Sequence, residues 1–98
     1  MEDLREKLIK KFKLEDIEVC DTFFKRLRGL MFFKPKNIAL VLNKETRYKA
    51  SIHMFFVFFP IDVYWLDSSL NIVEKRRCKP FSMATPKKKA KYIVELKI

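Results

Sequence analysis

The chain has 98 residues, of which 49% are hydrophobic and 35% charged, and its net charge is +10. This length predicts one domain, and the hydrophobic content with only one glycine excludes a disordered chain. Two cysteines and one histidine exclude a zinc-finger spacing. The positive charge is spread over both halves of the chain. This charge is typical either of proteins that bind polyanions or of heat-adapted proteins, which are enriched in lysine.

Residues 1–13 predict an N-terminal amphipathic helix. Leu4, Leu8 and Phe12 recur every four residues, with charged residues between them. Acidic side chains begin the segment and lysines end it, which suits the helix dipole. The alternative is that Leu8–Phe12 belongs to an edge strand. Residues 14–98 are expected to form a β-rich core.

The core is predicted from short segments of alternating apolar and polar residues. Strands are expected at Leu14–Cys20, Ile38–Leu42, Ile61–Leu66, Ile72–Arg77 and Tyr92–Ile98. A helical turn is expected before Gly29, a polar loop or hairpin at Asn43–Lys49, and irregular chain at Cys78–Pro86. The fold class is therefore mainly β with minor α: an antiparallel β-sandwich or partly closed barrel with one or two short helices.

The most hydrophobic stretch is Ser51–Asp67, which we expect at the centre of the core. Its uninterrupted apolar part is too short for a membrane span. Pro60 is expected to mark a bend or the start of a strand. His53 and Asp62 lie within this stretch, and burying an imidazole or a charge is costly unless it is paired. They are therefore the leading candidates for a site.

Several short motifs occur in the order of a known family. They are Arg26-x-x-Gly29-Leu30-Met31, Ser51-Ile52-His53-Met54-Phe55-Phe56, Pro60-Ile61-Asp62-Val63, Leu66-Asp67 and Tyr92-x-Val94-Glu95-Leu96. Together they resemble the domain of unknown function 192, or uncharacterised protein family 0127, over about Val19–Leu96. The resemblance implies a compact, jelly-roll-like β-sandwich. It implies no activity, because the family has no established one.

Two departures from the family pattern affect its expected sites. Val57 and Phe58 stand where similar members have Met and Arg, which weakens an anion site at that position. Many members continue past the closing Glu-Leu to a Gly, whereas this chain stops at Lys97-Ile98. A site built by that tail is therefore not expected here.

The candidate ligand-binding residues are Arg26, His53 and Asp62, which we expect to meet at one end of the sheet. A His–carboxylate pair can act as a base or orient a ligand. An Arg guanidinium can bind a carboxylate or phosphate through bidentate hydrogen bonds. The structural alternative makes Asp62 a cap at the bend and His53 a satisfied interior group. Arg26 would then pair with an acid such as Asp62 or Glu95.

The cysteines predict reduced thiols in a cytoplasmic protein, since the N-terminus shows no signal peptide. Cys20 ends a short apolar strand, so we expect a small buried hydrophobe. Nothing in the sequence places it near His53 for thiol catalysis. Cys78 is next to basic residues, which would lower its pKa if it were exposed. No catalytic residue is predicted. Whether the protein is an enzyme stays open, and the sequence favours a protein without catalytic activity.

The leading function hypothesis is noncatalytic binding of a small ligand or a protein partner. Nucleic-acid binding is the alternative, and a thiol or hydrolytic enzyme is the least favoured. The basic-surface candidates for nucleic acid are Lys75, Arg76, Arg77, Lys79, Lys87, Lys88, Lys89 and Lys91. No recognition-module signature accompanies them. No cofactor, metal site or membrane span is expected, and a monomer and a dimer both remain open.

Overall fold

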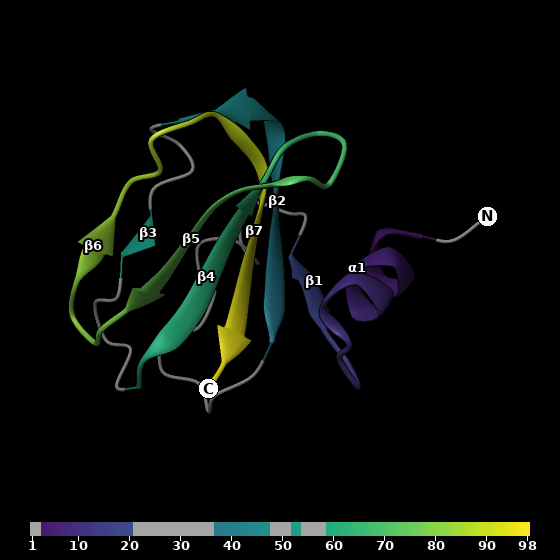
Figure 1. The fold of residues 1–98 in the computed structure, drawn as a ribbon, viewed down its shortest axis with the longest axis horizontal. Helices are drawn as coiled ribbons and strands as arrows, with labels where there is room; N and C mark the ends of the chain where they lie inside the picture. Colours follow the sequence, from purple (N-terminus) through teal and green to yellow (C-terminus); the bar gives the residue numbers. More distant parts are fainter. Residues whose placement is uncertain (1–2, 21–36, 48–51, 54–58) are drawn as a thin grey trace.

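The computed structural model describes residues 3–20, 37–47, 52–53 and 59–98, without the side chains of Ile52 and His53. Within these residues the chain is mainly β with one short helix, which confirms the predicted fold class. The elements are α1 (Leu4–Phe12), β1 (Glu18–Cys20), β2 (Ile38–Thr46), β3 (Ile52–His53), β4 (Ile61–Leu66), β5 (Ile72–Cys78), β6 (Met83–Ala84) and β7 (Ala90–Lys97). Figure 1 shows their arrangement.

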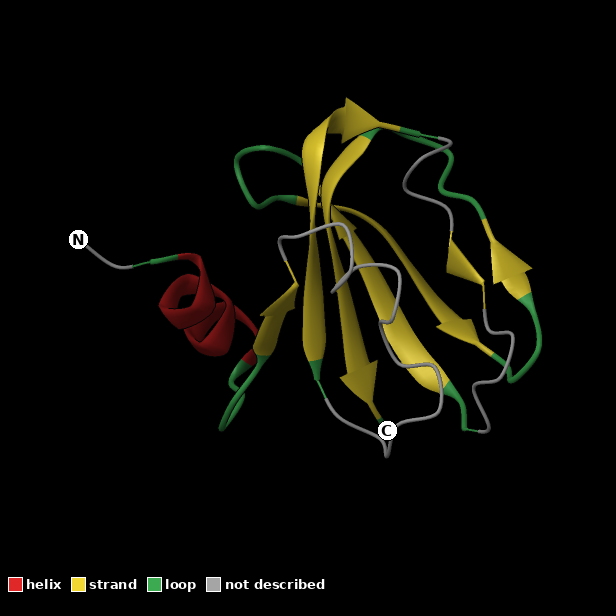
Figure 2. Cartoon of the chain, turned by 180° about the vertical axis from the view of Figure 1, so that it is seen from behind, coloured by secondary structure: helices red, strands yellow, loops and turns green. Residues whose placement is uncertain are grey.

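Five strands form one open sheet in the order β1-β2-β7-β4-β5, so that β7 lies at the centre. All neighbours are antiparallel except β1 and β2, which run parallel and make the sheet mixed. The other two strands, β3 and β6, pair with each other in a small second sheet. Figure 2 shows this small sheet beside the large one.

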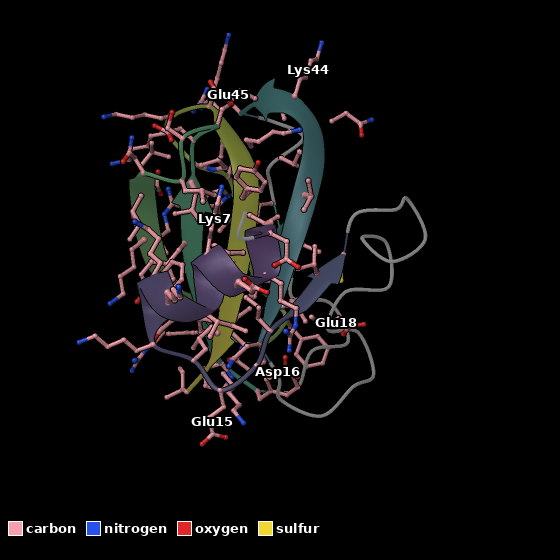
Figure 3. The ribbon with its side chains drawn as sticks, turned by 90° about the vertical axis from the view of Figure 1, so that its right-hand side faces the viewer. Lys7, Glu15, Asp16, Glu18, Lys44 and Glu45 are labelled. Atoms are coloured by element: carbon pink, nitrogen blue, oxygen red, sulfur yellow. The ribbon has the colours of Figure 1, made fainter. Side chains whose placement is uncertain are left out.

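The large sheet carries apolar side chains on both faces. One face holds Ile61, Val63 and Trp65 of β4, and Ala84 of β6 packs against it. The opposite face holds Val94 of β7 and receives Leu8 of α1. Figure 3 shows α1 lying across the strands. We call the first the inner face and the second the helix face. Each face buries enough apolar surface to determine which side chains of every strand point toward it.

Residues Leu4–Phe12 form the helix α1 and not an edge strand. The Asp3 carboxylate accepts a hydrogen bond of 2.8 Å from the Glu6 N–H, which satisfies one of the free donors at the helix start. Leu8 is fully buried, and the Phe12 ring meets Tyr64 edge to face with centroids 4.8 Å apart. The apolar stripe read from the sequence is thus the side that docks on the sheet.

The structure also refines several strand predictions. The hairpin of β4 and β5 is confirmed, with Asp62 opposite Arg77. Strand β2 runs on to Thr46, where a loop was expected, because a register shift after Val41 lets it continue to pair with β7. Strand β6 forms in a segment expected to be irregular. The helical turn predicted before Gly29 lies outside the described residues.

Candidate functional site

The predicted ligand site cannot be assembled from the described residues. Arg26 lies outside them, and of His53 only the backbone is described, in β3, where it pairs with Met83 of β6. Asp62 lies on β4, and its side chain is on the helix face, whereas β6 packs on the inner face. The joint site of Arg26, His53 and Asp62 therefore stays a prediction.

Asp62 has a partner that the sequence analysis did not consider, Arg77 on the neighbouring strand. Arg77 Nε donates to Asp62 Oδ1 at 2.9 Å and Arg77 Nη2 donates to Asp62 Oδ2 at 3.3 Å. The pair is therefore bidentate. The hydrogen bond from Arg77 lowers the pKa of the Asp62 carboxyl, against the opposing effect of burial. The Asp62 charge is therefore stabilised within the hairpin itself.

The exposure of this pair limits its contribution to stability. The Arg77 side chain is 64% exposed and that of Asp62 is 19% exposed, so solvent screens the attraction. We expect Asp62→Asn to lower the free energy of unfolding by less than about 1 kcal/mol at pH 7. Urea unfolding at pH 7 measures this change. A loss of several kcal/mol would contradict the prediction and indicate a buried charged network.

The most buried carboxyl group of the described chain is Glu95, on the central strand β7. The residue is 6% exposed, and it lies between Ile38 of β2 and Val63 of β4 on the inner face. Burial raises the pKa of Glu95 from its ordinary value of 4.5 to about 7.

The register of the sheet places several charged groups around Glu95. Lys97 lies two residues further along β7 on the same face. The row of Glu95 across the sheet ends at Glu18 of β1 on one side and Arg76 of β5 on the other. Cys78 lies on the same face, one row away. From the sequence, Glu95 was expected only within a family motif and as an alternative partner for Arg26. Its burial was not predicted, because the central position of β7 depends on pairing across the sheet.

Cys78 does not meet the condition of exposure under which its basic neighbours would lower the pKa of its thiol. Cys78 is 5% exposed, and burial, followed by the charge of Glu95, raises the pKa of its thiol. The nearby Arg76 opposes this effect but does not reverse it. Cys20 is buried as expected. Among the described residues, no three His, Cys, Asp or Glu side chains lie close enough together to hold a metal ion.

The basic residues of β5 and of the loop before β7 meet at the edge of the large sheet. They line a hollow of about 440 Å³, here called the β5 hollow, formed by Val73, Glu74, Lys75, Arg76, Lys87 and Lys88. The Lys75 ammonium lies 5.3 Å from the Tyr64 ring centroid, on the helix face, whereas Arg76 lies over Trp65 on the inner face. Arg76, Lys87, Lys88 and the Glu74 carboxylate thus come together from two segments of the chain.

The carboxylate of the β5 hollow is already engaged. Glu74 Oε2 is 2.5 Å from Arg76 Nε, and Oε1 accepts a 2.7 Å hydrogen bond from the Lys87 backbone N–H. The Arg76 guanidinium also donates to the Thr85 carbonyl at 3.1 Å and lies 5.8 Å from the Trp65 ring centroid. These contacts hold Arg76 in one orientation, and the loop carrying Lys87 is tied to β5.

The remaining basic-surface candidates do not join one patch. Arg77 pairs with Asp62 on the helix face. The Lys91 ammonium donates to the Leu42 carbonyl, so this lysine is drawn toward β2. Lys79 follows the end of β5, and Lys89 lies near Glu45. Of the eight predicted cations, four line the hollow as residues, and the ammonium of one of these, Lys75, lies over Tyr64 on the helix face.

A second hollow, of about 760 Å³, lies between the α1–β1 connection and the end of β7. Its lining mixes both signs of charge, with Glu15, Asp16 and Glu18 on one side and lysines on the other. Figure 3 shows these three acidic residues near the start of β1. Because the charges offset one another, this hollow favours no single class of ligand.

An open mixed sheet, backed by one helix and carrying basic residues along its β5 edge, defines a small, mainly β domain. The profile of the family described as "Uncharacterized ACR", domain of unknown function 192, matches residues 6–98. The chain therefore belongs to this family, and the resemblance noted in the sequence is confirmed. In the described part of the chain, no helix is long and apolar enough to cross a bilayer.

Curated relatives carry the name UPF0127 protein. One from Thermococcus kodakarensis is 53% identical over 81% of this chain and 52% of its own length. Another, from Pyrococcus horikoshii, is 43% identical over 82% of this chain and 70% of its own. The chain thus spans about half the length of the Thermococcus relatives that it matches.

Two solved structures share the fold. A protein of unknown function from Novosphingobium aromaticivorans gives a TM-score of 0.74 at 15% identity, covering 84% of this chain and 62% of that one. A Sinorhizobium meliloti protein, described as a candidate regulator of transcription, gives 0.75 at 17% identity, covering 83% and 67%. At these identities the likeness concerns the fold alone.

Proposed function

We propose that this domain is a noncatalytic binding module, and that its ligand is a small phosphate-bearing molecule held in the β5 hollow. The observation that supports this most is that Arg76, Lys87 and Lys88 line one hollow. Its volume of about 440 Å³ falls within the range of small-ligand sites. A cytoplasmic location, with no cofactor, remains part of this proposal.

The chemistry of the hollow suits an anion with several oxygen atoms. Glu74 is the only acid in its lining, and its two oxygens already accept from Arg76 and Lys87. A guanidinium carries five N–H donors, so Arg76 retains donors beyond its contacts with Glu74 and Thr85. The ammonium groups of Lys87 and Lys88 add positive charge on flexible side chains beside the Arg76 guanidinium.

Replacing two hollow lysines should weaken anion binding strongly. We expect the double variant Lys87→Gln/Lys88→Gln to bind inorganic pyrophosphate at least about tenfold more weakly, because charge-assisted hydrogen bonds are lost. Titration calorimetry at fixed ionic strength measures the affinity. The matched control is Lys7→Gln/Lys44→Gln, which removes the same charge from exposed positions on α1 and β2; Figure 3 labels both lysines.

The control variant distinguishes a site at the hollow from diffuse attraction by the net charge. Equal weakening in the two double variants would show diffuse attraction by the net charge and would contradict a site at the hollow. If Lys87→Gln/Lys88→Gln bound pyrophosphate with unchanged affinity, that result would also contradict a site at the hollow. Wild-type protein that does not bind pyrophosphate would refute the small-anion proposal.

Nucleic-acid binding is the second candidate function, and the cations beyond the hollow favour it. Lys79 and Lys89 are exposed and extend the positive charge of the β5 edge in two directions. A polymer of phosphates could contact these positions together with the hollow. Its affinity would then fall steeply with salt, with a slope that counts the phosphate contacts. A slope no larger for a 20-nucleotide single strand than for pyrophosphate would favour the small ligand.

A further inference from the structure

The turn that joins β5 to β6 presents apolar side chains to solvent. Phe81 is 54% exposed and Met83 is 67% exposed, although both residues could be polar in a surface turn. The turn is closed by Ser82, whose backbone N–H and hydroxyl reach the Lys79 carbonyl at 3.3 and 2.6 Å. We call Lys79–Met83 the apolar tip.

The backbone of the tip is held in an unfavourable conformation at its aromatic residue. Phe81 has φ of 60°, in the left-handed region that glycine or asparagine normally occupies. A phenylalanine in this conformation costs conformational energy, and about half of the residue stays exposed. The turn would be easier to form with glycine at this position. The exposed ring is therefore a feature that the fold carries at a cost to stability.

Cations surround the tip at the same end of the sheet. Lys79 belongs to the tip and is exposed. Ile61 of β4 pairs with Cys78 of β5 on one side and with Lys97 of β7 on the other. The exposed Lys97 thus lies two strands, or about 10 Å, from the last residue of β5. Figure 1 shows the end of β7 and the β5–β6 turn toward the same lower part of the molecule.

We infer that the apolar tip docks on the surface of an anionic lipid bilayer, with Phe81 and Met83 entering the headgroup region. Phe81 lies in the turn and Met83 begins β6, and the two exposed side chains suit a deformable interface. Aromatic rings settle at this depth, and the lysines behind them face lipid phosphates. The net charge of +10 adds long-range attraction to a negative surface. This inference is independent of the proposed ligand in the β5 hollow.

The test compares vesicle binding of variants that have the same charge. In co-sedimentation with phosphatidylcholine vesicles containing phosphatidylglycerol, Phe81→Ser/Met83→Ser should reduce the partition coefficient about tenfold or more. The matched control is Ile72→Ser, which removes an apolar side chain that is 47% exposed at the opposite end of β5. It should leave binding unchanged. Thermal unfolding of each variant verifies that the fold is retained.

A second readout reports insertion directly and does not depend on the serine variants. We expect the tryptophan emission of Phe81→Trp to shift to the blue when these vesicles are added, while the fully buried Trp65 contributes a constant background. Three results would overturn the inference: no binding by the wild-type protein, equal loss in the Ile72→Ser control, or no emission shift. Equal binding of the wild type and the serine double variant would also overturn it, since charge alone would then explain adsorption.

Discussion

Glu95→Gln should stabilise the protein by about 3 kcal/mol at pH 8 and leave its stability nearly unchanged at pH 4. The pKa of Glu95 rises from 4.5 to about 7 on folding, and each pKa unit corresponds to roughly 1.4 kcal/mol. Above pH 7 the folded protein therefore holds a buried charge that glutamine would remove. Urea unfolding of both proteins at the two pH values measures the difference.

The direction of the pH dependence follows from the proton count. Because the folded state holds its proton up to about pH 7, it binds more protons than the unfolded chain between pH 4.5 and 7. The Glu95 contribution to stability is complete below pH 4.5 and is lost as the pH rises through 7. The variant should lack this decline. Asp62 acts in the opposite sense, since its lowered pKa removes stability only under acidic conditions.

The other titratable groups near Glu95 affect the wild type and the variant alike, so their contribution cancels in this comparison. Glu18, Arg76 and Cys78 share the inner face, and all three are present in both proteins. Glu15→Gln is the matched control, because Glu15 is an exposed carboxylate in the α1–β1 connection. It should change the free energy of unfolding little at either pH. If Glu95→Gln were less stable than the wild type at pH 8, the charge would have to be held by a partner, contrary to this prediction.

Leu8→Ala should lower the free energy of unfolding by about 2–5 kcal/mol. Leu8 is fully buried between α1 and the helix face of the sheet. Its truncation would leave a cavity beside Val94 and Leu66, which belong to the same cluster. Chemical denaturation followed by circular dichroism measures this loss.

A substitution one residue away separates docking from helix propensity. Lys7 is exposed on α1, and Lys7→Ala should change stability by no more than about 0.5 kcal/mol. If Leu8→Ala cost as little as Lys7→Ala, α1 would not be docked on the sheet. A large loss for Leu8→Ala alone would show that the helix contributes to the core.

The fold was predictable where the signal is local. The spacing of Leu4, Leu8 and Phe12 places one stripe against the sheet, and the turn after Leu66 returns the chain as a hairpin. The parallel pairing of β1 with β2 was not predictable, because it depends on contacts across the sheet. A register shift between Trp65 and Leu66 determines that Asp62 faces Arg77. Residue counting along a regular hairpin would give another partner.

The burial of Glu95 shows why alternation alone can mislead. In Tyr92–Ile98 the set of Ile93, Glu95 and Lys97 reads as the more polar side, which suggests solvent. That interpretation holds only when one face of a strand is exposed. Strand β7 lies at the centre of a sheet that is covered on both faces, so both sets are drawn inward. The burial of Glu95 depends on this placement, which only tertiary structure supplies.

The central position of β7 also affects how the protein is made. Strands β2 and β4 are synthesised well before residues 90–97, yet each pairs with β7. Until β7 leaves the ribosome, the growing chain holds two incomplete halves of a sheet with open edges. The last strand therefore joins these halves in a single late step. Mutations that weaken β7 should reduce the yield of soluble protein in cells more than equal losses elsewhere.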